Sequence, residues 1–318
     1  MTRREFSALL GGSLVLVTPF AAYSQRKVPR IGILMTSGPE LMGPYREAFR
    51  ELGYIEGQTV EFELREARGR IDRLPGMAEE LVRGKVDVIV ASQTPAVVAA
   101  KHATQDIPIV MGAAGDPIAT GLVTNLARPE ANVTGLSATS AELAAKNLEL
   151  VREILPHARR VGVVANETDP FAKPFVEQIR NGAQAMRLEV QEVFVRAPDQ
   201  LDGAIATIAG RGAEAILIQG SLPPTTTVDS ATKHRIPAFS NQKNFAVAGA
   251  LTSYSASFAE RARGIASYVD KILKGAKPGD LPVQQPNTFE LVVNVKAAKM
   301  LGLVVPPTMI ARADEVIE

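Results

Sequence analysis

The stretch Arg30-Ile31-Gly32-Ile33-Leu34 returns in similar form as Arg160-Val161-Gly162-Val163-Val164, 130 residues further along the chain. Two more pairs of stretches have nearly the same spacing, of 128 and 129 residues: Asp87-Val88-Ile89-Val90 with Ala215-Ile216-Leu217-Ile218, and Ile107-Pro108-Ile109 with Ile236-Pro237-Ala238. This period is far longer than the roughly 20–50 residues of solenoid repeats. The repeat therefore indicates two domains of similar fold.

Each half alternates short apolar runs with amphipathic stretches, a pattern typical of buried parallel strands in βαβ units. We expect strands at 31–35, 60–64, 86–91, 109–112, 133–136, 161–165, 190–195, 215–219 and 238–240. We expect helices at 45–52, 74–83, 96–104, 121–126, 141–154, 171–186, 201–210, 228–233 and 245–248. Right-handed crossovers then give an α/β fold with a doubly wound parallel sheet in each half, and ligands bind at the carboxyl ends of such strands.

The C-terminal part adds a strand at 251–254, a helix at 258–273, a strand at 289–294 and a helix at 295–301. One half does not need these elements, so we expect the chain to cross between the domains more than once. We place lobe 1 at 28–137 plus roughly 255–282, and lobe 2 at 138–254 plus roughly 283–318. Two lobes joined by several crossings form a hinge and a central cleft.

Composition excludes several classes of protein. The 318 residues carry a net charge of +1, whereas nucleic-acid-binding proteins usually show a basic face. The absence of Cys excludes disulfides and Cys-ligated metals. The three His are scattered, and no GxGxxG after a strand, P-loop or GxSxG motif is present. We therefore expect no catalytic residue, metal or cofactor.

Residues 1–24 resemble an export signal, with paired arginines at Arg3-Arg4, an apolar stretch at 7–20, and small residues before position 25. The arginine pair fits a twin-arginine signal, and a Sec signal fits equally well. Both predict a periplasmic protein.

Several motifs resemble the ABC-transporter substrate-binding family that includes tryptophan- and tyrosine-binding proteins. They include Gly115-Asp116-Pro117, Gly121-Leu122-Val123, Asn132-Val133-Thr134-Gly135, Leu155-Pro156, Gly249-Ala250-Leu251-Thr252-Ser253-Tyr254 and Ala311-Arg312-Ala313-Asp314-Glu315. The resemblance covers residues 28–318 and implies a type-I periplasmic binding protein fold with a small-molecule ligand in the interlobe cleft. It also implies that the protein is a monomer and that its partners are an ABC permease and the ATPase of that permease. Contact with the membrane would then occur only through the permease.

Polar residues that directly follow apolar strands are the candidates for ligand binding. They are Ser37, Ser92, Gln93, Thr94, Asp116, Asn166, Ser221 and Tyr254. Asp116 could pair with a ligand ammonium or hydroxyl, or could form an N-cap for a helix near Gly121 or a turn. Ser92 and Thr94 could bind a carboxylate or cap the next helix, Asn166 could be a turn residue before Pro170, and Tyr254 could stack on a ring or belong to the core.

At one position this chain differs from the family it resembles. The family often has an acidic or amide residue after the strand that ends at Gln219, and this chain has Gly220-Ser221 there. An α-amino-acid ligand is thereby put in doubt, and an aromatic or aliphatic carboxylate stays open. We expect the solute-binding protein of an ABC importer. The alternatives are a periplasmic protein that reports to a sensor kinase, and an α/β enzyme.

Overall fold

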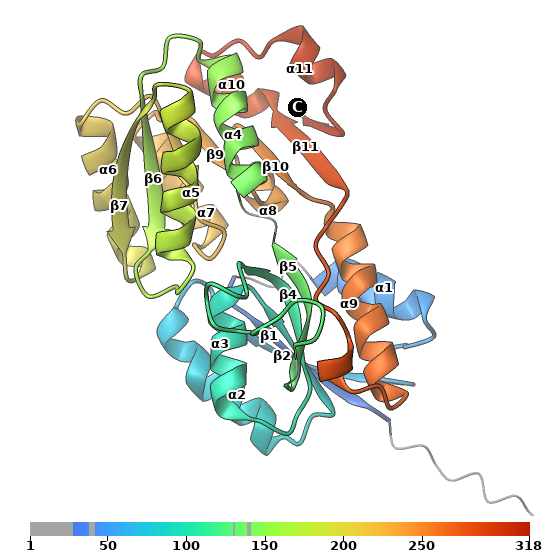
Figure 1. Cartoon of the computed structure of the whole chain (residues 1–318). Coiled ribbons are helices and arrows are strands. Elements are labelled where there is room, and N and C mark those ends of the chain that lie inside the picture. Colours follow the sequence, from blue (N-terminus) through green and yellow to red (C-terminus); the bar gives the residue numbers. More distant parts are fainter. Residues whose placement is uncertain (1–27, 38–41, 130, 139–140) are drawn as a thin grey trace, which may run out of the picture.

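Two α/β lobes lie one above the other, each built around its own sheet (Figure 1). The computed structural model describes residues 28–37, 42–129, 131–138 and 141–318. Lobe 1, the lower one in Figure 1, holds a five-stranded sheet, and lobe 2 holds a seven-stranded sheet. The two doubly wound lobes predicted from the repeat are confirmed.

The sheet of lobe 1 has the strand order β2-β1-β3-β4-β5, and all its neighbouring strands are parallel. These strands are β1 (Arg30–Met35), β2 (Glu61–Glu66), β3 (Val88–Ser92), β4 (Ile109–Gly115) and β5 (Val133–Ala138).

Helices cover both faces of this sheet. Ile31 and Ile33 of β1 pack toward α1 (Met42–Glu51) and α9 (Phe258–Leu273). Leu34 points the other way, toward α2 (Leu74–Arg83) and α3 (Thr94–Ala103). Burial of both strand faces explains why the strands are continuous apolar runs in the sequence.

The sheet of lobe 2 has the order β12-β11-β10-β9-β8-β6-β7, and it is parallel except where β11 runs antiparallel to β10. Its strands are β6 (Arg160–Asn166), β7 (Glu189–Val195), β8 (Ala215–Ile218), β9 (Ala238–Ser240), β10 (Thr252–Ala256), β11 (Phe289–Asn294) and β12 (Glu315–Ile317). The repeated stretches form equivalent strands, with β1, β3 and β4 matching β6, β8 and β9.

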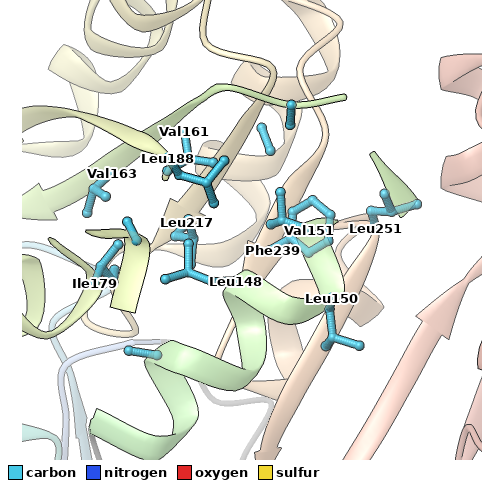
Figure 2. Packing of buried hydrophobic residues seen from close by; sticks show 14 of the residues in the cluster. Leu148, Leu150, Val151, Val161, Val163, Ile179, Leu188, Leu217, Phe239 and Leu251 are labelled. Carbon is cyan, nitrogen blue, oxygen red and sulfur yellow. The ribbon is translucent and has the colours of Figure 1, made fainter. Parts of the chain in front are cut away.

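One face of this second sheet packs on α4 (Ala141–Ile154), α5 (Ala172–Ala185), α10 (Val295–Leu301) and α11 (Pro307–Ala311). Figure 2 shows Leu148 and Val151 of α4 beside Leu217 and Phe239 of the sheet in this core. The other face packs on α6 (Leu201–Gly210), α7 (Pro224–Lys233) and α8 (Lys243–Val247).

The chain passes between the lobes after β5, after β10 and before β11. Helix α9 therefore packs on α1 and on β3–β5 of lobe 1, although it follows lobe 2 elements in the sequence. Three connections between two rigid lobes are the arrangement that permits hinge motion.

The structure corrects several expectations about elements. Residues 121–126 form turns rather than a helix, because Gly121 has a positive φ of 69° and Lys101 Nζ takes the carbonyls of Gly121 and Leu122 as acceptors, at 2.7 and 3.0 Å. The sequence also did not reveal the antiparallel direction of β11, the helix α11 that begins at Pro307, or β12.

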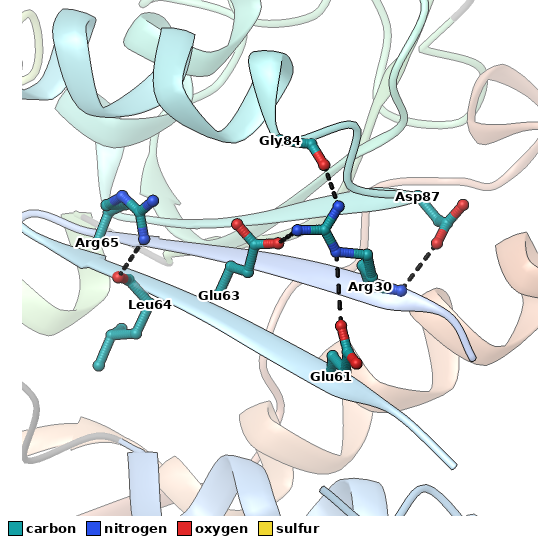
Figure 3. A network of polar contacts seen from close by, with 7 residues as sticks. All are labelled: Arg30, Glu61, Glu63, Leu64, Arg65, Gly84 and Asp87. Atoms are coloured by element: carbon teal, nitrogen blue, oxygen red, sulfur yellow. Dashed lines mark hydrogen bonds and ion pairs between the residues drawn. The ribbon is translucent and has the colours of Figure 1, made fainter. Parts of the chain in front are cut away.

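Charged groups at the amino ends of the lobe 1 strands pair with one another (Figure 3). The Arg30 backbone N–H donates to Asp87 at 2.8 Å, and its guanidinium contacts Glu63 and the Gly84 carbonyl. Partly exposed pairs of this kind add little to stability. The opposite, carboxyl ends of the strands differ, because some polar groups there have no hydrogen-bond partner among the described residues.

Candidate ligand-binding site

The lobes meet at the carboxyl ends of their strands. Gln93, directly after β3, donates from Nε2 to the Gly220 carbonyl of lobe 2 at 2.5 Å and to Gln242 Oε1 at 3.2 Å. At the end of β4, Gly115 lies directly against the ring of Phe171, which precedes α5 in lobe 2. The strand ends of both lobes thus form one interlobe boundary.

Gln93 is held in a strained conformation at this boundary. Its φ of 73° and ψ of 159° lie in a region that is essentially restricted to glycine, at a cost of about 1–3 kcal/mol. Its side chain is buried, and its Oε1 atom accepts no hydrogen bond from the described residues. Strain of this kind gathers at functional sites, because the surrounding structure must enforce it.

The three predicted hydroxyl side chains of lobe 1 differ in their hydrogen bonds. Ser37 is 1% exposed, and its hydroxyl has no partner in the described part of the chain. Ser92 Oγ lies 3.0 Å from the Tyr45 hydroxyl, and Thr94 Oγ1 accepts from the Gly115 N–H at 2.9 Å. Of these three side chains, Ser37 therefore has the most hydrogen-bonding capacity left for a ligand.

Asp116 forms a turn. Its Oδ1 accepts from the Ala119 N–H at 3.0 Å, and its backbone has a φ of 30°. No helix follows at Gly121, so the N-cap alternative is wrong and the turn alternative describes its contacts.

In lobe 2, polar groups follow β6 and β8. Asn166 ends β6, and its Oδ1 accepts from the N–H and the hydroxyl of Thr168, at 3.0 and 2.7 Å. The Asn166 N–H donates to Gln219 Oε1 at 2.7 Å, which fixes the amide of Gln219. Asn166 is therefore largely engaged in its own loop.

Asp169 lies in the same loop and is 5% exposed. Its two oxygens accept from the Phe171 N–H and from Gln219 Nε2, both at 2.8 Å. The Ser221 hydroxyl lies beside the carboxylate and lowers its pKa, although its geometry completes no hydrogen bond. Asp169 is not among the residues predicted from the sequence, where Asn166 represents this loop.

The electrostatics of Asp169 are unusual. Burial raises the pKa of the Asp169 carboxyl from 3.8 to about 6, against the smaller lowering effects of Ser221 and the Phe171 N–H. Among the described residues no Lys, Arg or His forms an ion pair with it. A buried carboxylate without a cation is costly, so a cationic ligand group would bind favourably beside it.

Tyr254 packs within the protein. Its ring stacks on that of Phe289 with centroids 5.8 Å apart, next to the core under α4. This contact agrees with the alternative that Tyr254 belongs to the core.

Several buried polar atoms near the strand ends of the two lobes have no hydrogen-bond partner among the described residues. Within the described ranges they include Ser37 Oγ, Gln93 Oε1, Ser221 Oγ, Asn241 Oδ1 and Ser253 Oγ. Such atoms are rare in folded proteins because each loses its hydration without compensation. These atoms are therefore candidates for contacts with a polar ligand.

The sequence of residues 39–317 matches the family described as "ABC transporter substrate binding protein". The chain belongs to this family. Its members are solute-binding proteins rather than enzymes, and substrate-binding proteins of ABC transporters act outside the cytoplasm.

Relatives of this substrate-binding protein have been described by sequence and by structure. The tyrosine-binding protein of Clostridioides difficile strain R20291 is 29% identical over 263 residues, which are 81% of this chain and 75% of that protein. A conserved domain protein from Vibrio cholerae has a TM-score of 0.83 at 29% identity, covering 91% of this chain and all of that one. A Streptococcus domain crystallised with L-Trp has a TM-score of 0.82 at 25% identity, covering 92% and 100%.

The predicted export signal, residues 1–24, lies outside the described residues. No helix within the described ranges has the length and apolar character needed to cross a membrane.

Proposed function

We propose that this substrate-binding protein captures a small amino acid or related ammonium compound in the interlobe cleft and delivers it to an ABC permease and its ATPase. The observation that carries the proposal is Asp169, a buried carboxylate in the loop after β6, beside the interlobe boundary, with no cation paired to it in the described structure. The relatives named for tyrosine binding and crystallised with L-Trp support the same ligand class.

Asp169 supports an amino-acid ligand despite the sequence difference at Gly220-Ser221. Gly220-Ser221 stand where the family often has an acidic or amide residue, but Asp169 comes to the same edge from the loop after β6 and lies beside Ser221. A ligand ammonium at this point would receive a charge-assisted hydrogen bond. It would also remove the cost of burying the isolated carboxylate.

The hydroxyls without a partner in the described residues could bind the carboxylate group of an amino acid. Ser37 and Ser221 come from different lobes, and both can donate to a carboxylate oxygen. We propose that they and Gln93 contact the ligand. Ser92, Thr94, Asp116, Asn166 and Tyr254 are engaged in the contacts described above, and we propose that they shape the site.

Titration calorimetry with L-tyrosine and L-tryptophan tests this function. We expect Asp169→Asn to weaken binding about ten- to a hundredfold, the value of a hydrogen bond to a charged group. The matched control is Asp106→Asn, which changes an exposed acid after α3 and should leave binding unaltered. The analogue 3-(4-hydroxyphenyl)propionate lacks the ammonium, and equal binding of this analogue and L-tyrosine would contradict the role of Asp169.

We also propose that residues 1–24 direct export to the periplasm and that the lobes have the boundaries predicted above. Cell fractionation of the full chain and of a chain without residues 1–24 tests the first point. Finding the shortened chain in the periplasm would contradict it.

A further inference from the structure

The two lobes also touch at a point away from the polar strand ends. Gly69, in the turn after β2, lies against the ring of Pro223, which directly precedes α7 in lobe 2. A Cβ atom added to Gly69 would lie 2.7 Å from Cδ and 3.0 Å from Cγ of Pro223, and real Cβ atoms essentially never come closer than 3.0 Å to another heavy atom. The backbone of one lobe therefore packs directly on a ring of the other. We call this pair of residues the mouth contact.

The strand order places the mouth contact on the side of the cleft that faces away from the hinge. The connections between the lobes join β5 of lobe 1 to lobe 2 and continue from β10 and into β11. In lobe 1, β5 and β2 are the opposite edges of the sheet, and in lobe 2 Pro223 follows β8, which β9 separates from β10. In Figure 1, α7 lies on the left of the interlobe boundary and the connections lie on its right. A ligand can leave on this side when the lobes separate.

Both sides of the mouth contact are rigid. Gly69 is buried with a φ of 78°, and its N–H donates to the Thr36 carbonyl at 2.7 Å. The Pro223 carbonyl accepts from the N–H and the hydroxyl of Thr227, at 3.1 and 2.7 Å, and the rings of Pro223 and Pro224 restrict their own φ angles. Close-packed groups of this kind yield little. An atom added at this contact must therefore move one lobe relative to the other.

Charges beside the mouth contact add little to it. The pKa of Arg70 is raised mainly by its hydrogen bonds to Asp72 in the same lobe, and to a smaller extent by Asp199, which lies in lobe 2 just before α6. The attraction between Arg70 and Asp199 acts in the direction of closure, but solvent and salt screen exposed charges. Packing of Gly69 on Pro223 is therefore the interaction that a substitution can test.

We propose that the mouth contact controls the escape of the ligand, so that Gly69 and Pro223 are positioning residues that set its dissociation rate. The interlobe cavity has a volume of about 510 Å³, and its walls include Pro224 and Arg261 but neither Gly69 nor Pro223. The two residues therefore act through lobe closure: contacts that are lost on opening favour the closed state, and such differences appear chiefly in the dissociation rate. The inference rests on the proposed function for its probe, L-tyrosine.

Displacement of radiolabelled L-tyrosine by an excess of unlabelled L-tyrosine measures this rate. We expect Gly69→Ala to speed dissociation about tenfold, because the added methyl group holds the lobes apart at the mouth contact. Gly57→Ala is the matched control. Gly57 has nearly the same φ, 77°, so alanine strains the backbone equally, but a Cβ there would meet nothing within 4 Å. Its dissociation rate should equal that of the unmodified protein.

A second substitution distinguishes a contact between lobes from a local defect. Pro223→Ala alone should also speed dissociation, because the ring no longer packs on Gly69. Combined with Gly69→Ala it should restore most of the slow dissociation, because the two ring atoms nearest to the new methyl group are gone. Equal rates for Gly69→Ala and Gly57→Ala, or effects of the two substitutions that simply add, would overturn the proposal. If Gly69→Ala fails to fold, an unchanged rate for Pro223→Ala overturns it.

A disulfide tests the contact without any ligand. The chain has no Cys, and a Cβ on Gly69 would lie 3.2 Å from Cβ of Pro223, close to the roughly 3.5–4.5 Å found in disulfides. We expect Gly69→Cys with Pro223→Cys to lose both free thiols under mild oxidation, and the oxidised protein to release L-tyrosine at least about tenfold more slowly than the reduced protein. Two free thiols that persist in the folded protein would overturn the proposal. Disulfide formation without any binding of L-tyrosine would instead count against the proposed function.

Discussion

Two residues near the boundary between the lobes are charged and have no ion-pair partner, and their charges are opposite. Asp169 is a buried acid with no cation paired to it, and the Arg261 guanidinium, with its Nε buried, has no anion paired to it, within the part of the chain that the structure describes. Burying a charge without a partner costs free energy. A ligand that pairs with such a charged group can offset this free-energy cost.

The first prediction concerns pH and Asp169. Its folded-state pKa of about 6 exceeds the ordinary 3.8, so the folded protein favours the protonated form. The stabilisation is fully present below about pH 3.8 and is lost as the pH rises through 6. Relative to Asp169→Asn, the free energy of unfolding of the unmodified protein should fall by up to about 3 kcal/mol between pH 4 and pH 7.

Urea unfolding of both proteins at several pH values measures this difference. The asparagine also places a donor opposite Gln219 Nε2, which alters its absolute stability, so only the pH dependence is compared. The contributions of the other titrating groups are the same in both proteins and cancel when the two free energies of unfolding are subtracted. A constant difference from pH 4 to pH 7 would show that Asp169 has an ordinary pKa.

The second prediction concerns the strain at Gln93. Gln93→Ala removes the interlobe hydrogen bonds and keeps the strained backbone, whereas Gln93→Gly removes both. We therefore expect the glycine variant to be more stable than the alanine variant, by up to about 3 kcal/mol in urea unfolding. At exposed Gln105, which has no positive φ, the same two substitutions should rank in the opposite order. An equal or lower stability of Gln93→Gly would show that the backbone is unstrained.

At the scale of elements, local sequence determined most of the fold. Strands such as β1 and β6 are buried on both faces by helices, so their apolar runs are visible without any tertiary information. The direction of β11 was not predictable, because its pairing with β10 depends on how the chain returns from lobe 1. The turns at 121–126 depend on Lys101, a contact between segments about 20 residues apart.

Only part of the proposed site could be predicted, from polar side chains close to strand ends. That rule identified Ser37, Gln93 and Ser221, whose polar atoms do lack partners in the described structure. It missed Asp169, which a loop brings to the edge, and Arg261, which lies on a helix that returns to lobe 1 after β10. For both, the relevant property is the lack of a charged partner, and only tertiary structure reveals it.

The third prediction concerns the contact between the end of β4 and the start of α5. A Cβ on Gly115 would overlap the ring of Phe171 in the other lobe. Because the two residues belong to different lobes, we expect Gly115→Ala to separate the lobes rather than unfold either one. Small-angle scattering should show a larger radius of gyration, with little change in the midpoint of thermal unfolding.

Two variants make this test specific. Adding Phe171→Ala to Gly115→Ala should restore the original radius of gyration, since the ring that obstructs the new methyl group is gone. Gly203→Ala is the control, because a Cβ on Gly203 in α6 would meet nothing within 4 Å. Unfolding of Gly115→Ala at room temperature would instead show that the contact is part of a single rigid core.

At the scale of the whole molecule, the two lobes are separate packing units whose boundary is polar. Their main apolar cores lie between sheet and helices within each lobe, whereas groups such as Gln93, Gly220 and Gln242 meet across the boundary. Few apolar contacts therefore oppose opening of the cleft. We therefore expect the position of the lobes to depend on what is bound between them.

The last prediction follows from this arrangement. A ligand favours the closed state only through contacts that are lost on opening, and the proposed contacts come from Ser37 and Gln93 in lobe 1 and from Asp169 and Ser221 in lobe 2. Small-angle scattering should therefore give a smaller radius of gyration with saturating L-tyrosine than without it. For Gln93→Ala, which loses the direct bond to Gly220, the ligand-free radius should be larger and the decrease on binding greater. If calorimetry shows that L-tyrosine binds while the radius stays constant in both proteins, the lobes are fixed and the strand-end boundary does not act as a hinged cleft.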